Sequence, residues 1–151
     1  MEGISMESAQ REKLAALLAQ QHVAVIATNG DEWPTATLQA FAETPELDLL
    51  FIMIDTAEKY QNLIKRPKVT VFIDSRHDLE PSNLDIARAA IQGVADEIPF
   101  ASEAAAPLKA LFLKKNPFEE PYFGHPALRL VRIKPKRVSY THGKDAFKVT
   151  I

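Results

Sequence analysis

The chain has no cysteine among its 151 residues, and aromatic residues make up only 8% of it. Without cysteine, disulfides, thiolate nucleophiles and cysteine-ligated zinc or iron–sulfur sites are excluded. The charges nearly cancel, leaving a formal net charge of −2 and a pI near 6.1. Such a chain has no global field that would recruit nucleic acid or an anionic membrane, so we expect neither as a partner.

Long apolar runs are also missing. The N-terminal segment MEGISMESAQREK lacks the apolar core of a signal peptide, and no apolar run approaches the roughly 20 residues that span a bilayer. We therefore expect a cytoplasmic protein. The four histidines have no metal-ligand spacing, so no metal site is predicted. They are His22, His77, His125 and His142.

What is present is the composition of an ordinary globular domain, with 46% hydrophobic and 25% charged residues. At this length we expect a single domain over residues 1–151. An amphipathic helix is predicted over about residues 5–20, with one apolar face packed as a lid on the core. That face consists of Leu14, Leu17 and Leu18.

Apolar runs and period-2 alternation predict six to seven strands after this helix. They cover residues 23–28, 33–42, 47–54, 69–73, 84–98, 127–141 and 146–151. Asn29-Gly30 is a strong hairpin signal, and the first three strands are expected to form an antiparallel meander. Gly93 indicates a bulge or a close backbone approach, although the segment around Ile91 would also suit a helix. The expected fold is mainly β, an antiparallel barrel with a few helices.

A helix and a loop are predicted between the strands at 84–98 and 127–141. Residues 102–115 are rich in alanine and leucine and are predicted to form a helix, with Pro107 in its first turn or at a kink. The segment NPFEEPYFGHP that follows is predicted to be a loop carrying aromatic side chains.

The most informative stretch runs from Leu49 to Asp74 and is expected to form strand, short helix and strand. If Thr56 lies near the helix cap, Lys59 lies about one turn in, beside amide groups without helical partners. The hydroxyl, the ammonium group and the free amides could together bind a phosphate. The alternative is an exposed Lys59 whose charge is offset by Glu58 and Asp55. Tyr60, Leu63 and Ile64 are predicted to form the apolar face of this helix.

A second group of charges lies on the predicted strand at 127–141. Its five basic side chains could contact an anion, or could form a solvated strand face on an otherwise near-neutral chain. They are Arg129, Arg132, Lys134, Lys136 and Arg137.

The order of the motifs resembles the FMN-binding split-barrel family of pyridoxamine 5′-phosphate oxidase-like proteins. HVAVIATNGDEWPTATLQAF resembles the opening hairpin of that family, and LLFIMIDTAEKYQNLIKRPKVTVFID resembles its phosphate-binding strand–helix–strand. AAIQGVADEI resembles a later strand with an apolar-x-Gly-x-Ala signature, and LRLVRIKPKRVSYTHG the closing strand. The resemblance covers residues 10 to 143. It implies a homodimer with FMN at the subunit interface.

The resemblance also implies which residues contact the cofactor. Lys59 and Thr56 would hold the phosphate, the strand at 37–39 would run beside the isoalloxazine ring, and Ile54 would border the ribityl chain. Arg88 falls where the family often places a polar residue near the flavin. The full set of expected FMN contacts is Thr37, Leu38, Gln39, Ile54, Asp55, Thr56, Lys59 and Arg88.

The end of the chain departs from true pyridoxamine phosphate oxidases. Tyr140 stands where those enzymes carry a tryptophan, and THGKDAFKVTI lacks their substrate-binding motif, so pyridoxal phosphate synthesis is not expected. An FMN-dependent oxidoreductase of unassigned substrate is the leading hypothesis, and no catalytic residue is assigned because the flavin carries the chemistry. The alternatives are a non-catalytic or flavin-responsive FMN-binding protein, and a split barrel that binds haem or a deazaflavin.

Overall fold

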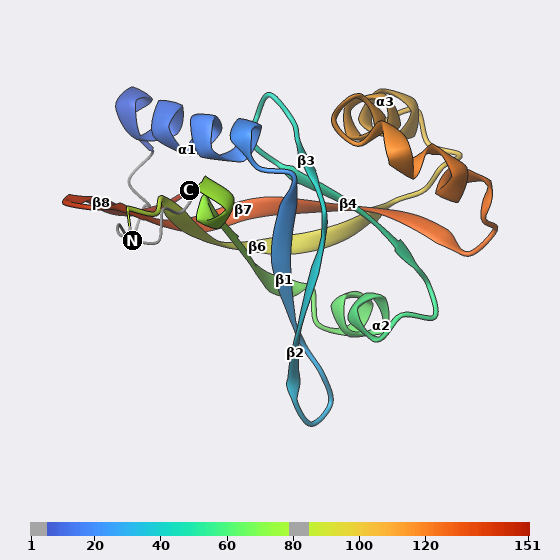
Figure 1. The fold of residues 1–151 in the computed structure, drawn as a ribbon. Coiled ribbons are helices and arrows are strands. Elements are labelled where there is room, and N and C mark those ends of the chain that lie inside the picture. The colour runs from blue at the N-terminus through green and yellow to red at the C-terminus, as the bar shows by residue number, and fades with distance from the viewer. Residues whose placement is uncertain (1–5, 79–84) are drawn as a thin grey trace.

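One antiparallel sheet of eight strands forms the framework of the computed structural model, which describes residues 6–78 and 85–151. The strands are β1 (Val23–Asn29), β2 (Pro34–Ala40), β3 (Ala42–Glu43), β4 (Leu49–Ile54), β5 (Lys68–Asp74), β6 (Arg88–Ile98), β7 (Leu128–His142) and β8 (Asp145–Thr150). Their order is β2-β1-β5-β6-β7-β4-β3, with β8 paired to β7 off this path. The two end strands, β2 and β3, follow one another in the chain, so the sheet curls towards a barrel (Figure 1).

The prediction of a mainly β fold is confirmed, and one predicted strand is divided. The run at 33–42 becomes β2 and β3, separated by Phe41, whose side chain is fully buried. β2 pairs with β1, and β3 pairs with β4. The expected antiparallel meander of three strands is therefore present, but its middle strand is divided in two at Phe41. β4 pairs along its whole length with β7. Leu84, the predicted start of the fifth strand, lies outside the described residues.

Three α-helices and two 3-10 helices complete the chain. They are α1 (Ser8–Gln20), α2 (Glu58–Lys65), η1 (Arg76–Asp78), α3 (Ala105–Lys115) and η2 (Pro117–Gly124). α1 begins at Ser8 because Glu7 and Gln10 form a capping box; the predicted start at residue 5 lies outside the described residues. Pro107 lies in the first turn of α3, and η2 occupies the segment predicted to be a loop.

The main core fills the inside of the curled sheet, and helices close its two ends. Leu14, Leu17 and Leu18 of α1 enter this core as predicted, and Tyr60 and Leu63 of α2 enter it too. Figure 1 shows α1 and α2 on opposite sides of the long strands, with α2 beside the β1–β2 hairpin. α3 covers part of the outer face, over two smaller clusters of buried side chains. No described helix has the length and apolarity that a transmembrane helix needs.

The pairing of β6 with β7 contains the irregularity that Gly93 indicated, and the helical alternative for this segment is excluded. Gln92 pairs with Arg137 but Gly93 pairs with Pro135, so Lys136 is an extra residue on β7. A Cβ atom at Gly93 would lie 2.5 Å from the carbonyl oxygen of Lys134 and 2.8 Å from Cγ2 of Ile133. β7 therefore approaches β6 more closely than any side chain at this position allows.

We predict that Gly93→Ala destabilises the fold by about 1–3 kcal/mol, because backbone atoms of β7 must move to admit the methyl group. Urea denaturation followed by circular dichroism measures the change. Gly124→Ala is the matched control, since a Cβ atom there has nothing within 4 Å. Equal unfolding midpoints for the two variants would contradict the close approach.

Candidate functional site

The first turn of α2 has no side-chain cap. Its N-cap residue is Ala57, and neither Asp55 nor Thr56 supplies the capping hydrogen bond. Thr56 lies one residue before the cap and is exposed. Because a helix leaves its first amide groups without internal partners, this end of α2 can accept an anion.

Buried contacts fix the position of α2. The Asn62 Nδ2 donates to Thr28 Oγ1 at 3.1 Å, and the Tyr60 hydroxyl donates to the Glu97 carboxylate. That hydrogen bond and burial raise the pKa of Tyr60. The prediction that Ile64 belongs to the buried face is wrong: its side chain is 50% exposed, and Asn62 is buried in its place.

A cavity of about 240 Å³ opens beside the start of α2, where it meets β2, β4 and η2. Its lining residues are Gln39, Ala40, Ile52, Met53, Ile54, Ala57, Lys59, Glu119, Tyr122 and Leu128. Gln39 donates from Nε2 to the Ile52 carbonyl at 3.0 Å, but its buried Oε1 has no partner. The Oγ1 of Thr37, also on β2, is buried without a partner. Two polar atoms of one strand are thus buried without a hydrogen-bond partner, next to the cavity lining.

Lys59 is partly buried at this cavity and has no ion pair with the described residues. Burial lowers its pKa, because desolvation disfavours the ammonium form. Asp55 instead accepts a hydrogen bond from Arg129 at 2.9 Å, so it does not offset Lys59. Glu119 is the only acidic residue in the lining. An anion in the cavity would compensate the desolvated ammonium group.

The residues expected to contact FMN are not all together in one chain. Gln39, Ile54 and Lys59 line the cavity. Leu38 lies on the edge strand β2 with 64% of its surface exposed. Arg88 is exposed at the start of β6, where it lies opposite Asp74 of β5 and Thr141 of β7 in the strand register. Glu97, which contacts α2, lies near the other end of β6.

Sequence reasoning gave two interpretations of Tyr122, stacking on a planar ligand or completing the core, and the structure places it in the cavity lining. Glu119 was missed, because it lies in a segment with no apolar periodicity that only the three-dimensional packing brings to this cavity. Among the described residues, no group of three or more His, Asp or Glu side chains could hold a metal ion.

Comparison with known families gives one match over most of the chain. The model of the pyridoxamine 5′-phosphate oxidase family matches residues 10–142. The chain belongs to this family. The resemblance of the motif order, together with the expected split-barrel fold, is thereby confirmed. No match was found among proteins of curated function.

Solved structures of similar fold bind different cofactors. A haem-binding protein from Mycobacterium smegmatis has a TM-score of 0.84 and 21% identity over 97% of this chain, which spans 60% of that protein. An FAD-binding protein from Mesorhizobium loti has a TM-score of 0.71 and 15% identity, over 92% of this chain and 93% of that one. HutZ, the haem storage protein from Vibrio cholerae, has a TM-score of 0.69 and 16% identity, over 97% and 96%. At these identities the likeness shows the fold alone.

We predict that Lys59→Met raises the free energy of unfolding at pH 7, and that this gain shrinks as the pH approaches 10.5. The pKa of Lys59 is lower in the folded chain than in the unfolded chain. At pH values between these two pKa values the unfolded chain binds more protons, so the free energy of unfolding of the wild type rises with pH. Urea midpoints at several pH values measure the difference between the two proteins. Lys65→Met, exposed in the last turn of α2, should show no such trend.

Proposed function

We propose that the cavity beside α2 is part of an FMN site and that the protein is a flavin-dependent oxidoreductase. The observation that carries the proposal is the unpaired, desolvated Lys59 at the uncapped start of α2. A phosphate monoester suits this position, because the ammonium group and the free helix amides offer charge-assisted hydrogen bonds to its oxygens.

The remaining lining fits the rest of a flavin. Gln39 contributes a carboxamide to the lining, a group that can hydrogen-bond to a ring edge or a ribityl hydroxyl. Ile52, Ile54 and Leu128 provide apolar walls, and Tyr122 an aromatic one. When bound, FMN would supply hydride and electron transfer. The chain's own residues would hold the phosphate, orient the ring and exclude water.

The site is incomplete in one chain, and we propose that a second copy completes it. A cavity of about 240 Å³ is below the ~300–1,000 Å³ of typical small-molecule sites. Large apolar side chains remain exposed on β2 and η2, two of the elements that line this cavity. They are Leu38, Phe118 and Tyr122. A symmetric dimer would cover such groups and could bring residues such as Arg88 to the cofactor from the partner.

Haem is the second candidate, because two of the similar structures are haem proteins. Among the described residues, no histidine lines the cavity of about 240 Å³ beside α2 or the cavity of about 540 Å³ elsewhere on the sheet. Tyr122 lines the one beside α2, and a phenolate can be an axial ligand. A deazaflavin would use the same anion-binding groups as FMN. A non-catalytic flavin-binding role would leave the same cofactor site without turnover.

We predict that the purified protein retains FMN on gel filtration and that Lys59→Ala weakens FMN binding tenfold or more. The reason is that a charge-assisted hydrogen bond contributes about 1.5–3 kcal/mol. Flavin fluorescence titration measures both Kd values. Riboflavin, which has no phosphate, should bind wild type and Lys59→Ala alike, and Lys65→Ala should bind FMN as wild type does.

The same titration separates the alternatives. A Soret band on adding haem, without flavin retention, would favour the haem reading and contradict the flavin proposal. FMN retention without oxidation of a reduced nicotinamide cofactor, across a panel of acceptors, would favour the non-catalytic role. Equal FMN affinity of wild type and Lys59→Ala would remove Lys59 from the site.

We predict that multi-angle light scattering gives twice the chain mass of 16.8 kDa at micromolar concentration. The reason is that the exposed apolar side chains beside the cavity need a partner surface. Leu38→Lys should shift the mass towards the monomer and weaken FMN binding together. Glu103→Lys serves as the exposed control, since Glu103 lies before α3 and away from this cavity. A monomeric wild type that retains FMN fully would contradict the shared site.

A further inference from the structure

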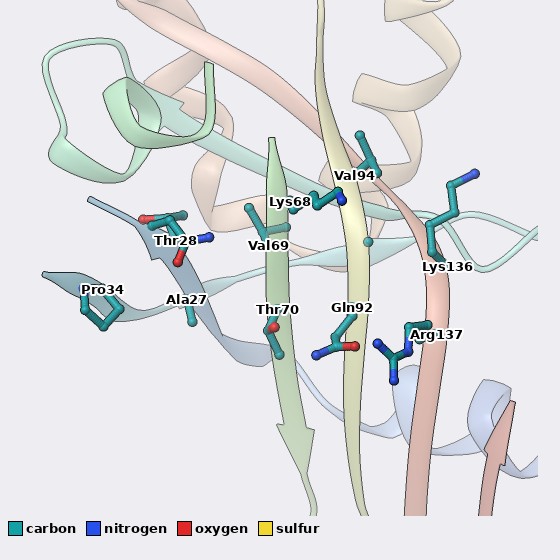
Figure 2. A pocket seen from close by; sticks show the side chains of 12 residues that line it. Ala27, Thr28, Pro34, Lys68, Val69, Thr70, Gln92, Val94, Lys136 and Arg137 are labelled. Carbon is teal, nitrogen blue, oxygen red and sulfur yellow. The ribbon is translucent and has the colours of Figure 1, made fainter. Parts of the chain in front are cut away.

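A cavity of about 540 Å³ lies outside the proposed flavin site. It is a trough on the outer face of β1, β5, β6 and β7, with Pro34 of β2 at one side, and it shares no lining residue with the cavity beside α2. Its volume is within the range of small-molecule sites. Figure 2 shows side chains from these strands around it.

Three cations line this trough, and none of the described residues in its lining is acidic. Lys68, Lys136 and Arg137 form no ion pair and no side-chain hydrogen bond with the described residues. In Figure 2 Lys68 of β5 reaches towards Val94 on β6, and Arg137 of β7 reaches towards Gln92 on β6, while Lys136 stands at the rim. Three like charges near one another repel, so an anion between them would be stabilised.

The extra residue of β7 brings two of these cations to one cavity. Neighbouring residues of a regular strand point to opposite faces of the sheet, so only one of Lys136 and Arg137 would face a given side. Because Lys136 is the bulged residue, both side chains line the trough. The Lys136 carbonyl accepts the Ile151 amide at 2.7 Å, so the bulged backbone is held in place. Bulges that re-aim side chains in this way are common next to binding sites.

The basic group on β7 therefore separates into two sets. Arg129 pairs with Asp55 and Arg132 pairs with Asp96, at 2.9 and 3.1 Å. Lys136 and Arg137, by contrast, have no ion pair with the described residues and line the trough, with Lys136 at its rim (Figure 2). Its walls also carry the carboxamide of Gln92 and the hydroxyl of Thr70.

The trough has apolar surface as well. Ala27, Pro34 and Val94 contribute to it.

We propose that this trough binds a small organic polyanion, an apolar or planar body that carries phosphate or carboxylate groups. Arg137 and Lys68 bind the anionic groups from the two sides of β6, and Gln92 and Thr70 hydrogen-bond to the ligand. The apolar wall contacts its body. The site is independent of the flavin phosphate at Lys59.

Isothermal titration calorimetry tests the proposal with two probes, ADP for the phosphate class and citrate for the carboxylate class. Wild type should bind one of them at millimolar or lower concentration, with affinity falling as salt is added. Arg137→Ala and Lys68→Ala should each weaken that binding about tenfold, which corresponds to the loss of one charge-assisted bond. Which probe binds identifies the anionic group.

Lys134→Ala is the matched control, because Lys134 lies on the same strand, is exposed and does not line the trough. It removes the same charge and should leave probe binding unchanged. Lys59→Ala should also leave it unchanged, and Arg137→Ala should leave FMN retention unchanged. The three trough cations are exposed, so the variants should keep the wild-type urea midpoint.

Three results would overturn the proposal. Neither probe binding at millimolar concentration would remove the site. An equal loss with Lys134→Ala would mean that surface charge in general, and not the trough, holds the anion. Loss of FMN together with ADP in Arg137→Ala would mean that the trough belongs to the flavin site.

Discussion

The pairing of β6 with β7, interrupted by one extra residue, is the constraint on which the sheet depends. Core residues of β7 are odd-numbered before the bulge, at Val131 and Ile133, and even-numbered after it, at Val138 and Tyr140. In an unbroken register that kept Val131 and Ile133 in the core, Val138 and Tyr140 would turn out and the charge of Arg137 would point inwards. In one that kept Val138 and Tyr140 in the core, the charges of Arg132 and Lys134 would point inwards instead. A buried, unpaired guanidinium costs several kcal/mol, so the register break is required by the hydrophobic pattern itself. Gly93 permits it by letting the backbone of β7 come close.

The two sides of α2 differ in how well their polar groups are paired. The side that faces the core has its hydrogen bonds made, and the first turn does not. Asn62, Tyr60 and Leu63 fix its inner side through buried hydrogen bonds and apolar packing. Its first turn faces the cavity with an uncapped backbone and with Lys59, whose charge is desolvated. Gln39, whose buried Oε1 has no partner, lines the same cavity. Three unfavourable features at one place, in a fold otherwise well satisfied, are typical of a binding site rather than of a structural junction.

Most of the strands and the turn chemistry could be predicted from sequence, since they depend on local patterns. Alternation and turn residues located the strands, and Gly93 was identified as a bulge or close approach because a lone glycine in a strand has few other roles. Asn62 could not be predicted, because its burial depends on the hydroxyl of Thr28, which is distant in sequence and close only in the fold. The same applies to Glu119, which reaches the cavity through the path of η2. The break at Phe41 likewise follows from how the sheet curls, and no turn residue marks it.

The net charge of the chain hides how its charges are arranged. At −2 it excludes long-range attraction of polyanions, yet screening limits each charge to about 10 Å at 0.1 M salt, so a ligand experiences only its immediate neighbours. In the first half of β7, Arg129 pairs with Asp55 and Glu97, and Arg132 pairs with Asp96. Beyond the bulge, the trough lining contains no carboxylate from the described residues. The position of a basic residue along β7 therefore decides whether it has an acidic partner, and the bulge decides which face of the sheet its side chain lies on. A near-neutral chain can in this way leave cations without ion pairs in two separate places among its described residues, one at a helix start and one on a sheet face.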